Sequence, residues 1–154
     1  MSNTPYPLDK TAYLLVDPYN DFLSDGGKIF PLIKPMAEQN GLLDNLRKLD
    51  RTVRELKIPV VIVPHHRWEK GDYETWDHPT PTQCKIMHMH HFARGEWGGE
   101  WHPDFAPKDG DIVVQEHWGY SGFANTDLDF RLKQQGITHV IIVGLLANTC
   151  IEAT

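Results

Sequence analysis

The chain has 154 residues, of which 40% are hydrophobic and 23% are charged, as in an ordinary globular domain. Its formal charge of -6 comes from carboxylates spread along the sequence, without the basic stripe that a nucleic-acid partner requires. No apolar run approaches the ~20 residues that cross a bilayer, and residues 1–7 lack the pattern of a signal peptide. We therefore expect a cytoplasmic protein that forms a single domain over residues 1–154, with no nucleic-acid or membrane partner.

Four short apolar segments are predicted to be buried β-strands, because each is a nearly continuous apolar run of the length that strands have. They cover residues 11–17, 59–64, 111–115 and 138–144. The prolines next to the second segment fit the ends of a strand better than its middle.

Two segments between the strands have helical patterns. Residues 36–57 carry apolar side chains at helical spacing with charges between them, which predicts one long amphipathic helix. Residues 126–135 predict a shorter helix with Thr126 as N-cap, Asp129 at the capping-box position and Gly136 just beyond its end. The alternation of strands and helices predicts a three-layer α/β/α, doubly wound and mostly parallel sheet.

Residues 65–110 show no sustained period and are rich in His, Trp, Gly and Pro. Because a structureless stretch of this length in a compact domain usually has a function, we expect a long loop region that covers the substrate. It contains the only histidine cluster, at residues 88–91, but no further ligand lies at regular metal-binding spacing. We predict no catalytic metal and no cofactor.

Residues with catalytic potential follow three of the predicted strands. They are Asp17, the pair Glu116 and His117, and Cys150. The carboxyl ends of parallel strands form one rim, where ligands of such sheets bind. Cys150 also lies near the start of an expected helix, whose dipole would lower the pKa of the thiol. Taken singly, each residue is explained equally well by burial, a turn or an ordinary loop; their convergence on one rim favours a cysteine nucleophile.

Three segments resemble motifs of the isochorismatase-like cysteine hydrolases, a family that includes nicotinamidases, N-carbamoylsarcosine amidohydrolases and ureidoacrylate or biuret hydrolases. Residues 14–22 are similar to the opening strand of the family and its Asp-x-x-Asn-Asp-Phe turn. Residues 120–128 resemble its Ser-Ala-Phe-x-x-Thr-x-Leu segment, and residues 136–150 resemble its nucleophile strand and turn. Together the three motifs cover nearly the whole chain in the expected order.

The resemblance implies a role for each matching residue. Asp17 would be the general base, and Cys150 would attack a carbonyl carbon and form an acyl-enzyme. The amides of Leu146 and Cys150 would form the oxyanion hole, next to a cis peptide bond between Leu145 and Leu146. The substrate would be a small molecule with an amide or carbamoyl C–N bond, and the protein would be a homo-oligomer, either a dimer or a tetramer.

The chain departs from the family at the third catalytic position, where the family has a lysine. Counted from the preceding strand, this position falls on Glu116; counted back from Phe123, it falls on His117. We expect Glu116 to take the position because strand register is harder to shift than a loop. His117 would then lie nearby and bind substrate together with Tyr19, Trp118 and Phe123.

The sequence ends four residues after Cys150, whereas the family continues with a helix and further strands. We therefore expect that the C-terminal part of the domain is missing from this chain. Two other functions remain open. One is vinyl-ether hydrolysis of the isochorismatase type, which needs no thiol nucleophile, and the other is a catalytically impaired relative that acts as a binder or scaffold.

Overall fold

The computed structural model describes residues 6–154. The prediction that residues 1–7 are not a signal peptide therefore falls mostly outside the described residues. The chain forms two compact units. The first contains the chain up to Asp17 together with Asp44–His65 and Pro107–Thr154, and the second contains Pro18–Leu43 and His66–Ala106. None of the helices within residues 6–154 is long and apolar enough to cross a membrane.

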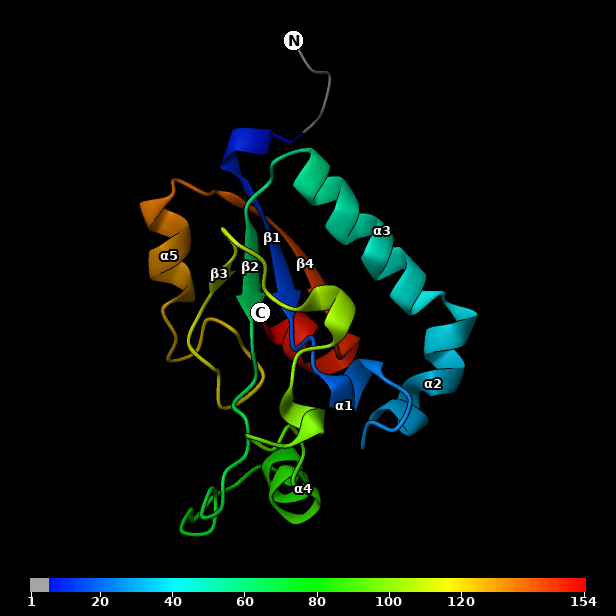
Figure 1. Cartoon of the computed structure of the whole chain (residues 1–154). Coiled ribbons are helices and arrows are strands. Elements are labelled where there is room, and N and C mark those ends of the chain that lie inside the picture. The colour runs from blue at the N-terminus through cyan, green and yellow to red at the C-terminus, as the bar shows by residue number, and fades with distance from the viewer. Residues whose placement is uncertain (1–5) are drawn as a thin grey trace. The chain divides into compact units, whose positions relative to one another are not determined.

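The first unit is built on a parallel sheet of four strands (Figure 1), which confirms the predicted strands and their direction. The strands are β1 (Thr11–Val16), β2 (Val60–Val63), β3 (Ile112–Val113) and β4 (His139–Gly144). Their order is β3-β2-β1-β4, so β1 is flanked by two neighbours and all six of its residues are buried. The carboxyl end of β1 therefore lies between those of β2 and β4.

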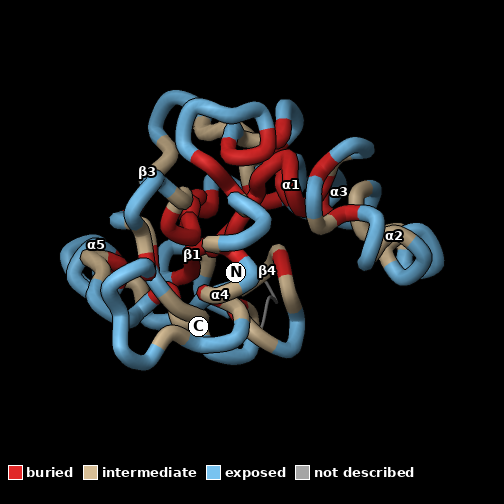
Figure 2. The backbone as a smooth tube through the Cα atoms, turned by 90° about the horizontal axis from the view of Figure 1, so that it is seen from below, coloured by how far each residue is buried: buried red, intermediate tan, exposed pale blue. Residues whose placement is uncertain are grey.

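Helices lie on both sides of this sheet, α3 (Leu42–Glu55) on one and α5 (Leu128–Gln134) on the other (Figure 1). Leu14 and Val16 of β1 share a buried cluster with Leu128 of α5. Tyr13, on the alternate face, lies close to charged groups of α3. Figure 2 shows that the buried residues gather along β1. The predicted three-layer α/β/α architecture is thus confirmed.

Strand β4 is the outermost strand on its side of the sheet in the part of the chain that the structure describes. Its first half is exposed, including the apolar side chains of Val140 and Ile141. A short 3-10 helix, Leu8–Lys10, precedes β1.

Two details of the predicted helices are wrong. The long helix over residues 36–57 is divided into α2 (Phe30–Gln39) and α3, because Gly41 adopts a φ of 60° that ends the helical path. The N-cap of α5 is Asp127 and not Thr126, although the Thr126 hydroxyl accepts a hydrogen bond from the Leu128 amide. Gly136 ends α5 in the left-handed conformation as predicted, with φ 67°.

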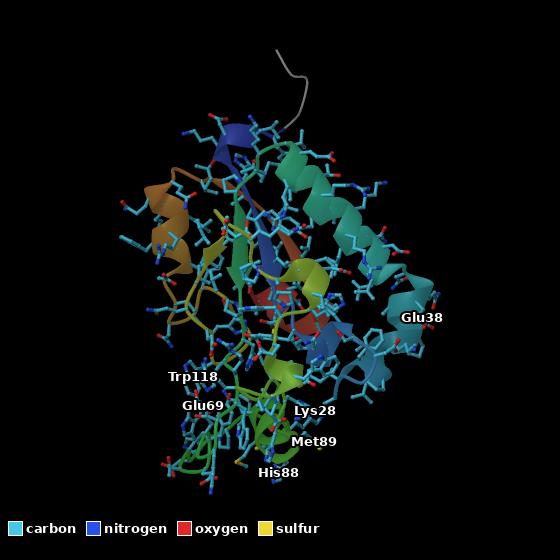
Figure 3. The ribbon with its side chains drawn as sticks, viewed as in Figure 1. Lys28, Glu38, Glu69, His88, Met89 and Trp118 are labelled. Atoms are coloured by element: carbon cyan, nitrogen blue, oxygen red, sulfur yellow. The ribbon has the colours of Figure 1, made fainter. Side chains whose placement is uncertain are left out.

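The second unit contains α1 (Asn20–Leu23), α2 and α4 (Pro81–Met89), with short 3-10 helices at Trp97–Gly99 and Pro103–Phe105. The prediction that residues 65–110 lack regular structure is therefore wrong. Helix α4 begins with a capping box in which Thr80 and Gln83 exchange side-chain hydrogen bonds. It ends at His88 and Met89, both labelled in Figure 3. Helix α4 lacks a clear apolar stripe, which explains why periodicity missed it.

A buried carboxylate joins distant loops of the second unit. Asp21 accepts hydrogen bonds from the backbone amides of Lys28, at 2.9 Å, and Phe92, at 2.7 Å. Gly98 packs so closely on this carboxylate that a Cβ atom there would lie 2.3 Å from Asp21 Oδ1. The Asn-Asp-Phe turn of the sequence thus has a structural task in holding residues 90–99 in place.

Candidate active site

Asp17 lies at the carboxyl end of β1 and is fully buried. Its φ of 55° is uncommon for a residue other than glycine, and the conformation is held by a hydrogen bond from its amide to the Val63 carbonyl of β2. Backbone conformations of this kind concentrate at functional sites. Within residues 6–154, nothing donates a hydrogen bond to Asp17 Oδ2, which leaves this oxygen available for a proton or a ligand.

His117 contacts Asp17 directly, with 3.1 Å between Nε2 and Asp17 Oδ1. The other ring nitrogen, Nδ1, lies 2.9 Å from the Gly119 carbonyl. Because a carbonyl only accepts, Nδ1 carries a hydrogen, and a further proton must lie between Nε2 and the carboxylate. Burial by itself lowers the pKa of His117, but the hydrogen bond and charge of Asp17 outweigh it and raise the pKa. The two side chains therefore share a proton between Nε2 and Asp17 Oδ1.

Cys150 joins this pair in the first unit, after the turn that follows β4. The peptide bond between Leu145 and Leu146 is cis, as the resemblance implies. A short π-helix, Ala147–Ile151, then carries the thiol, which is 5% exposed. Ligand atoms of Asp17, His117 and Cys150 all lie within 4.8 Å of one another. The structure thus brings together two of the three predicted catalytic residues, with His117 as the third member.

The predicted lowering of the Cys150 pKa is wrong. Burial raises the pKa of the thiol, and the nearby Asp17 carboxylate raises it further. Cys150 is therefore a protonated thiol at neutral pH, and it needs a base to become a nucleophile.

Gly144 permits the close approach of the nucleophile turn to β1. Its φ is 123°, and a Cβ atom there would lie 2.1 Å from the Val16 carbonyl oxygen. Any larger residue would push β4 away from β1 immediately before the turn. Glycine at this position therefore helps to bring Cys150 close to Asp17.

The prediction that Glu116 takes the position of the family lysine is wrong, because His117 is the residue that faces Asp17. The Val114 amide donates a hydrogen bond to the Ile62 carbonyl of β2. The next such bond runs from the His117 amide to the carbonyl of Pro64, which directly follows β2. Regular parallel pairing would use residue 116 instead, so one extra residue bulges out. The amide of Gln115, within the bulge, donates to Asp127 Oδ1 at 2.7 Å.

His65 is a buried neighbour that sequence reasoning missed. It follows β2, and its ring packs edge to face on the His117 ring, with 5.0 Å between centroids and 72° between planes. Its position directly after the predicted strand over residues 59–64 was the available signal.

The predicted substrate-binding aromatic residues differ in their surroundings. Trp118, labelled in Figure 3, is 39% exposed, and Phe123 is 37% exposed. Tyr19 belongs to the second unit, where its ring is buried and stacked on Trp101 with centroids 5.0 Å apart. Contact with substrate remains a prediction for all three.

Comparison with known proteins identifies the family of this chain. A family model described as "Isochorismatase domain" matches residues 11–154. The chain belongs to this family. A ureidoacrylate amidohydrolase of Pantoea ananatis is 27% identical to it over 94% of this chain and 62% of the relative. The chain thus spans less than two thirds of the length of this curated relative.

Solved structures of family members are similar as well. A cysteine hydrolase of Pseudomonas syringae pv. phaseolicola superposes with a TM-score of 0.78 and 25% identity, covering 98% of this chain and 66% of the other. N-carbamoylsarcosine amidase of Thermoplasma acidophilum superposes with a TM-score of 0.69 and 29% identity, covering 94% and 72%. The isochorismatase-like fold is therefore shown for this chain.

Proposed function

We propose that this protein is a cysteine hydrolase that cleaves the C–N bond of a small-molecule amide or carbamoyl compound through an acyl-enzyme at Cys150. The observation that carries the proposal is the buried cluster of Asp17, His117 and Cys150 at the carboxyl end of the sheet. The names of the relatives support the bond type, since both a ureidoacrylate amidohydrolase and an N-carbamoylsarcosine amidase are among them.

Asp17 acts as the general base. The Asp17 carboxylate lies within 4.8 Å of the protonated thiol of Cys150, so it can take the thiol proton as the sulfur attacks the carbonyl carbon. The same proton then passes to the departing nitrogen. In the second half of the reaction Asp17 takes a proton from water, which attacks the thioester and releases the acid.

His117 supplies the positive charge that the family lysine would provide. The imidazolium lies 3.1 Å from Asp17 Oδ1 and would stabilise the negative charge of this carboxylate. It also offsets the negative charge that develops when the thiolate forms in a buried site. The amides of Leu146 and Cys150 are the proposed donors to the oxyanion.

The test measures ammonia release from a panel of ureido acids, N-carbamoyl amino acids and primary amides. We expect turnover of at least one carbamoyl compound, with a loss of at least about 10³-fold in Cys150→Ser and Asp17→Asn. Cys84→Ser is the matched control and keeps full activity, since Cys84 is not among the residues of the buried cluster. A mass increase on Cys150 after rapid quenching would identify the acyl-enzyme.

Two outcomes would contradict the proposal. Turnover that survives Cys150→Ser would favour vinyl-ether hydrolysis without a thiol nucleophile. Absence of both turnover and a Cys150 adduct across the panel, in a protein whose circular dichroism shows it to be folded, would favour a binding or scaffolding protein.

A further inference from the structure

We propose that Asp17, His117 and Cys150 also form a reversible binding site for a thiophilic divalent cation, with Zn²⁺ as the ion that fits best. The bound ion would cap the nucleophile and block hydrolysis. Binding of the ion goes beyond the proposed function and does not depend on it, whereas inhibition rests on it.

The three residues supply one sulfur, one imidazole nitrogen and carboxylate oxygens, which are the ligand types of zinc in proteins. One ligand atom of each residue lies within 4.8 Å of the other two, which is close enough for the three to share an ion. Ligands 2.0–2.3 Å from a tetrahedral zinc ion are about 3.5 Å apart. The cluster therefore has nearly the dimensions of a zinc site before any ion enters.

The surroundings of the cluster orient the donors. The Gly119 carbonyl accepts the Nδ1 hydrogen of His117 and so turns Nε2 toward Asp17 and Cys150. Such an outer hydrogen bond is the usual support of a zinc-binding histidine. Asp17 Oδ2 is buried and receives no hydrogen bond from residues 6–154, so an ion would satisfy an acceptor that the protein leaves open.

The charges of the cluster match a divalent cation. When the ion enters, the thiol proton of Cys150 and the proton between His117 and Asp17 leave to solvent. The thiolate and the carboxylate then carry two negative charges, and the metal carries two positive charges, so the buried site becomes neutral. A water molecule can complete the tetrahedron, and the sulfur, now bound to metal, no longer attacks a substrate.

The substitution of the family lysine by histidine creates this site. A protonated lysine has no lone pair to give to a metal, so Asp17 and Cys150 alone would offer two ligands. His117 supplies the third ligand and still provides a positive charge when the ion is absent. Metal binding therefore depends on a histidine at residue 117.

The experiment titrates metal-free protein with Zn²⁺ in competition with a chromophoric chelator, without substrate. We expect one tightly bound equivalent and a loss of at least about 100-fold in affinity for both His117→Lys and Cys150→Ser. Cys84→Ser and the double variant His88→Gln/His90→Gln are matched controls that keep the affinity. Co²⁺ in place of Zn²⁺ should give a thiolate-to-cobalt absorption band that Cys150→Ser removes.

Equal Zn²⁺ affinity in the folded His117→Lys variant and the unaltered protein would overturn the proposal, as would loss of binding in the His88→Gln/His90→Gln control. Absence of the thiolate band would do so as well. A protein that hydrolyses carbamoyl compounds but binds no Zn²⁺ refutes this site alone, and one that binds Zn²⁺ but hydrolyses nothing refutes the proposed function alone. If both hold, one equivalent of Zn²⁺ abolishes turnover and a chelator restores it.

Discussion

At the scale of single residues, the site is decided by which side chain lies next to Asp17. The histidine there contacts Asp17 through Nε2 of a flat ring that has a second nitrogen on its other side. The ring is held by two acceptors, Asp17 Oδ1 and the Gly119 carbonyl, and by the edge of His65. A glutamate at the same place would add a second negative charge beside the base. The bulge at residue 115 avoids this conflict.

His117→Gln and Glu116→Gln form a matched pair, because both introduce the same neutral side chain at adjacent positions. We expect His117→Gln to lower kcat/KM by about 10²-fold to 10³-fold, since the buried charge that supports Asp17 and the thiolate is lost. Glu116→Gln should change it by less than about fivefold, because the charge of Glu116 has a smaller effect on His117 than Asp17 has. Steady-state ammonia release checks both. A larger loss in Glu116→Gln than in His117→Gln would contradict the assignment.

At the scale of elements, the end of β3 and the start of α5 are held together by Asp127. Its Oδ1 accepts from the Gln115 amide at 2.7 Å, and its Oδ2 pairs with Arg131 Nε at 2.9 Å. Partial burial alone would raise the pKa of Asp127, but these two donors outweigh it and lower the pKa. Because Gln115 lies in the bulge before His117, Asp127 also fixes the direction in which His117 leaves the strand.

Asp127→Ala should lower the free energy of unfolding at pH 7 by about 0.5–1.5 kcal/mol, because the exposed hydrogen bond from the Gln115 amide is lost. A carboxyl group whose pKa is lowered by folding stabilises the protein above its unfolded pKa of about 3.9 and loses this effect as pH falls through the folded value. The difference between the two proteins should therefore shrink in urea denaturation below about pH 3.9.

Arg131→Gln is the control for this prediction, since it removes the ion pair and leaves the bond to Gln115. It should cost less than about 1 kcal/mol. A difference between Asp127→Ala and the unaltered protein that stays constant down to pH 2 would rule out the carboxylate as its source.

At the scale of the whole first unit, a partly buried ion network joins segments that are far apart in sequence. Arg54 of α3 forms two hydrogen bonds with Asp111, at 2.8 and 2.7 Å, just before β3. Its Nε contacts both oxygens of Asp50 at 3.0 Å, and Lys108 reaches Asp50 at 3.1 Å. Both carboxylates are buried, so Arg54 and Lys108 are needed to balance their charge.

Arg54→Met should lower the free energy of unfolding by about 3–5 kcal/mol, because two buried carboxylates lose their main partner. Arg47→Met is the matched control on the same helix. Arg47 pairs with Asp44 at 3.0 Å, and both side chains are exposed, so its loss should cost less than about 1 kcal/mol. Urea denaturation followed by circular dichroism compares the two variants. Equal effects would show that the network contributes nothing beyond a surface ion pair.

The strands and the residues that follow them could be predicted from the sequence. A strand covered on both faces must be apolar at nearly every position, so the buried strands β1 and β2 appear as continuous apolar runs. Strand β4 is a similar apolar run, although its first half is exposed. Asp17 and Cys150 follow two of these runs, and strand direction then brings them to the same edge. Periodicity missed helix α4, because its start depends on a capping box. It also missed the break at Gly41, which depends on the φ angle of one residue.

The sequence by itself determined that the chain is an α/β domain with an acid and a thiol at the carboxyl ends of its strands. Only the tertiary structure decided that His117, and not Glu116, is their partner, because a one-residue bulge depends on hydrogen bonds between β3, β2 and the start of α5. It also decided that Cys150 holds its proton at rest. Burial and the nearness of Asp17 set this thiol pKa, and both arise from contacts between segments that are far apart in the chain.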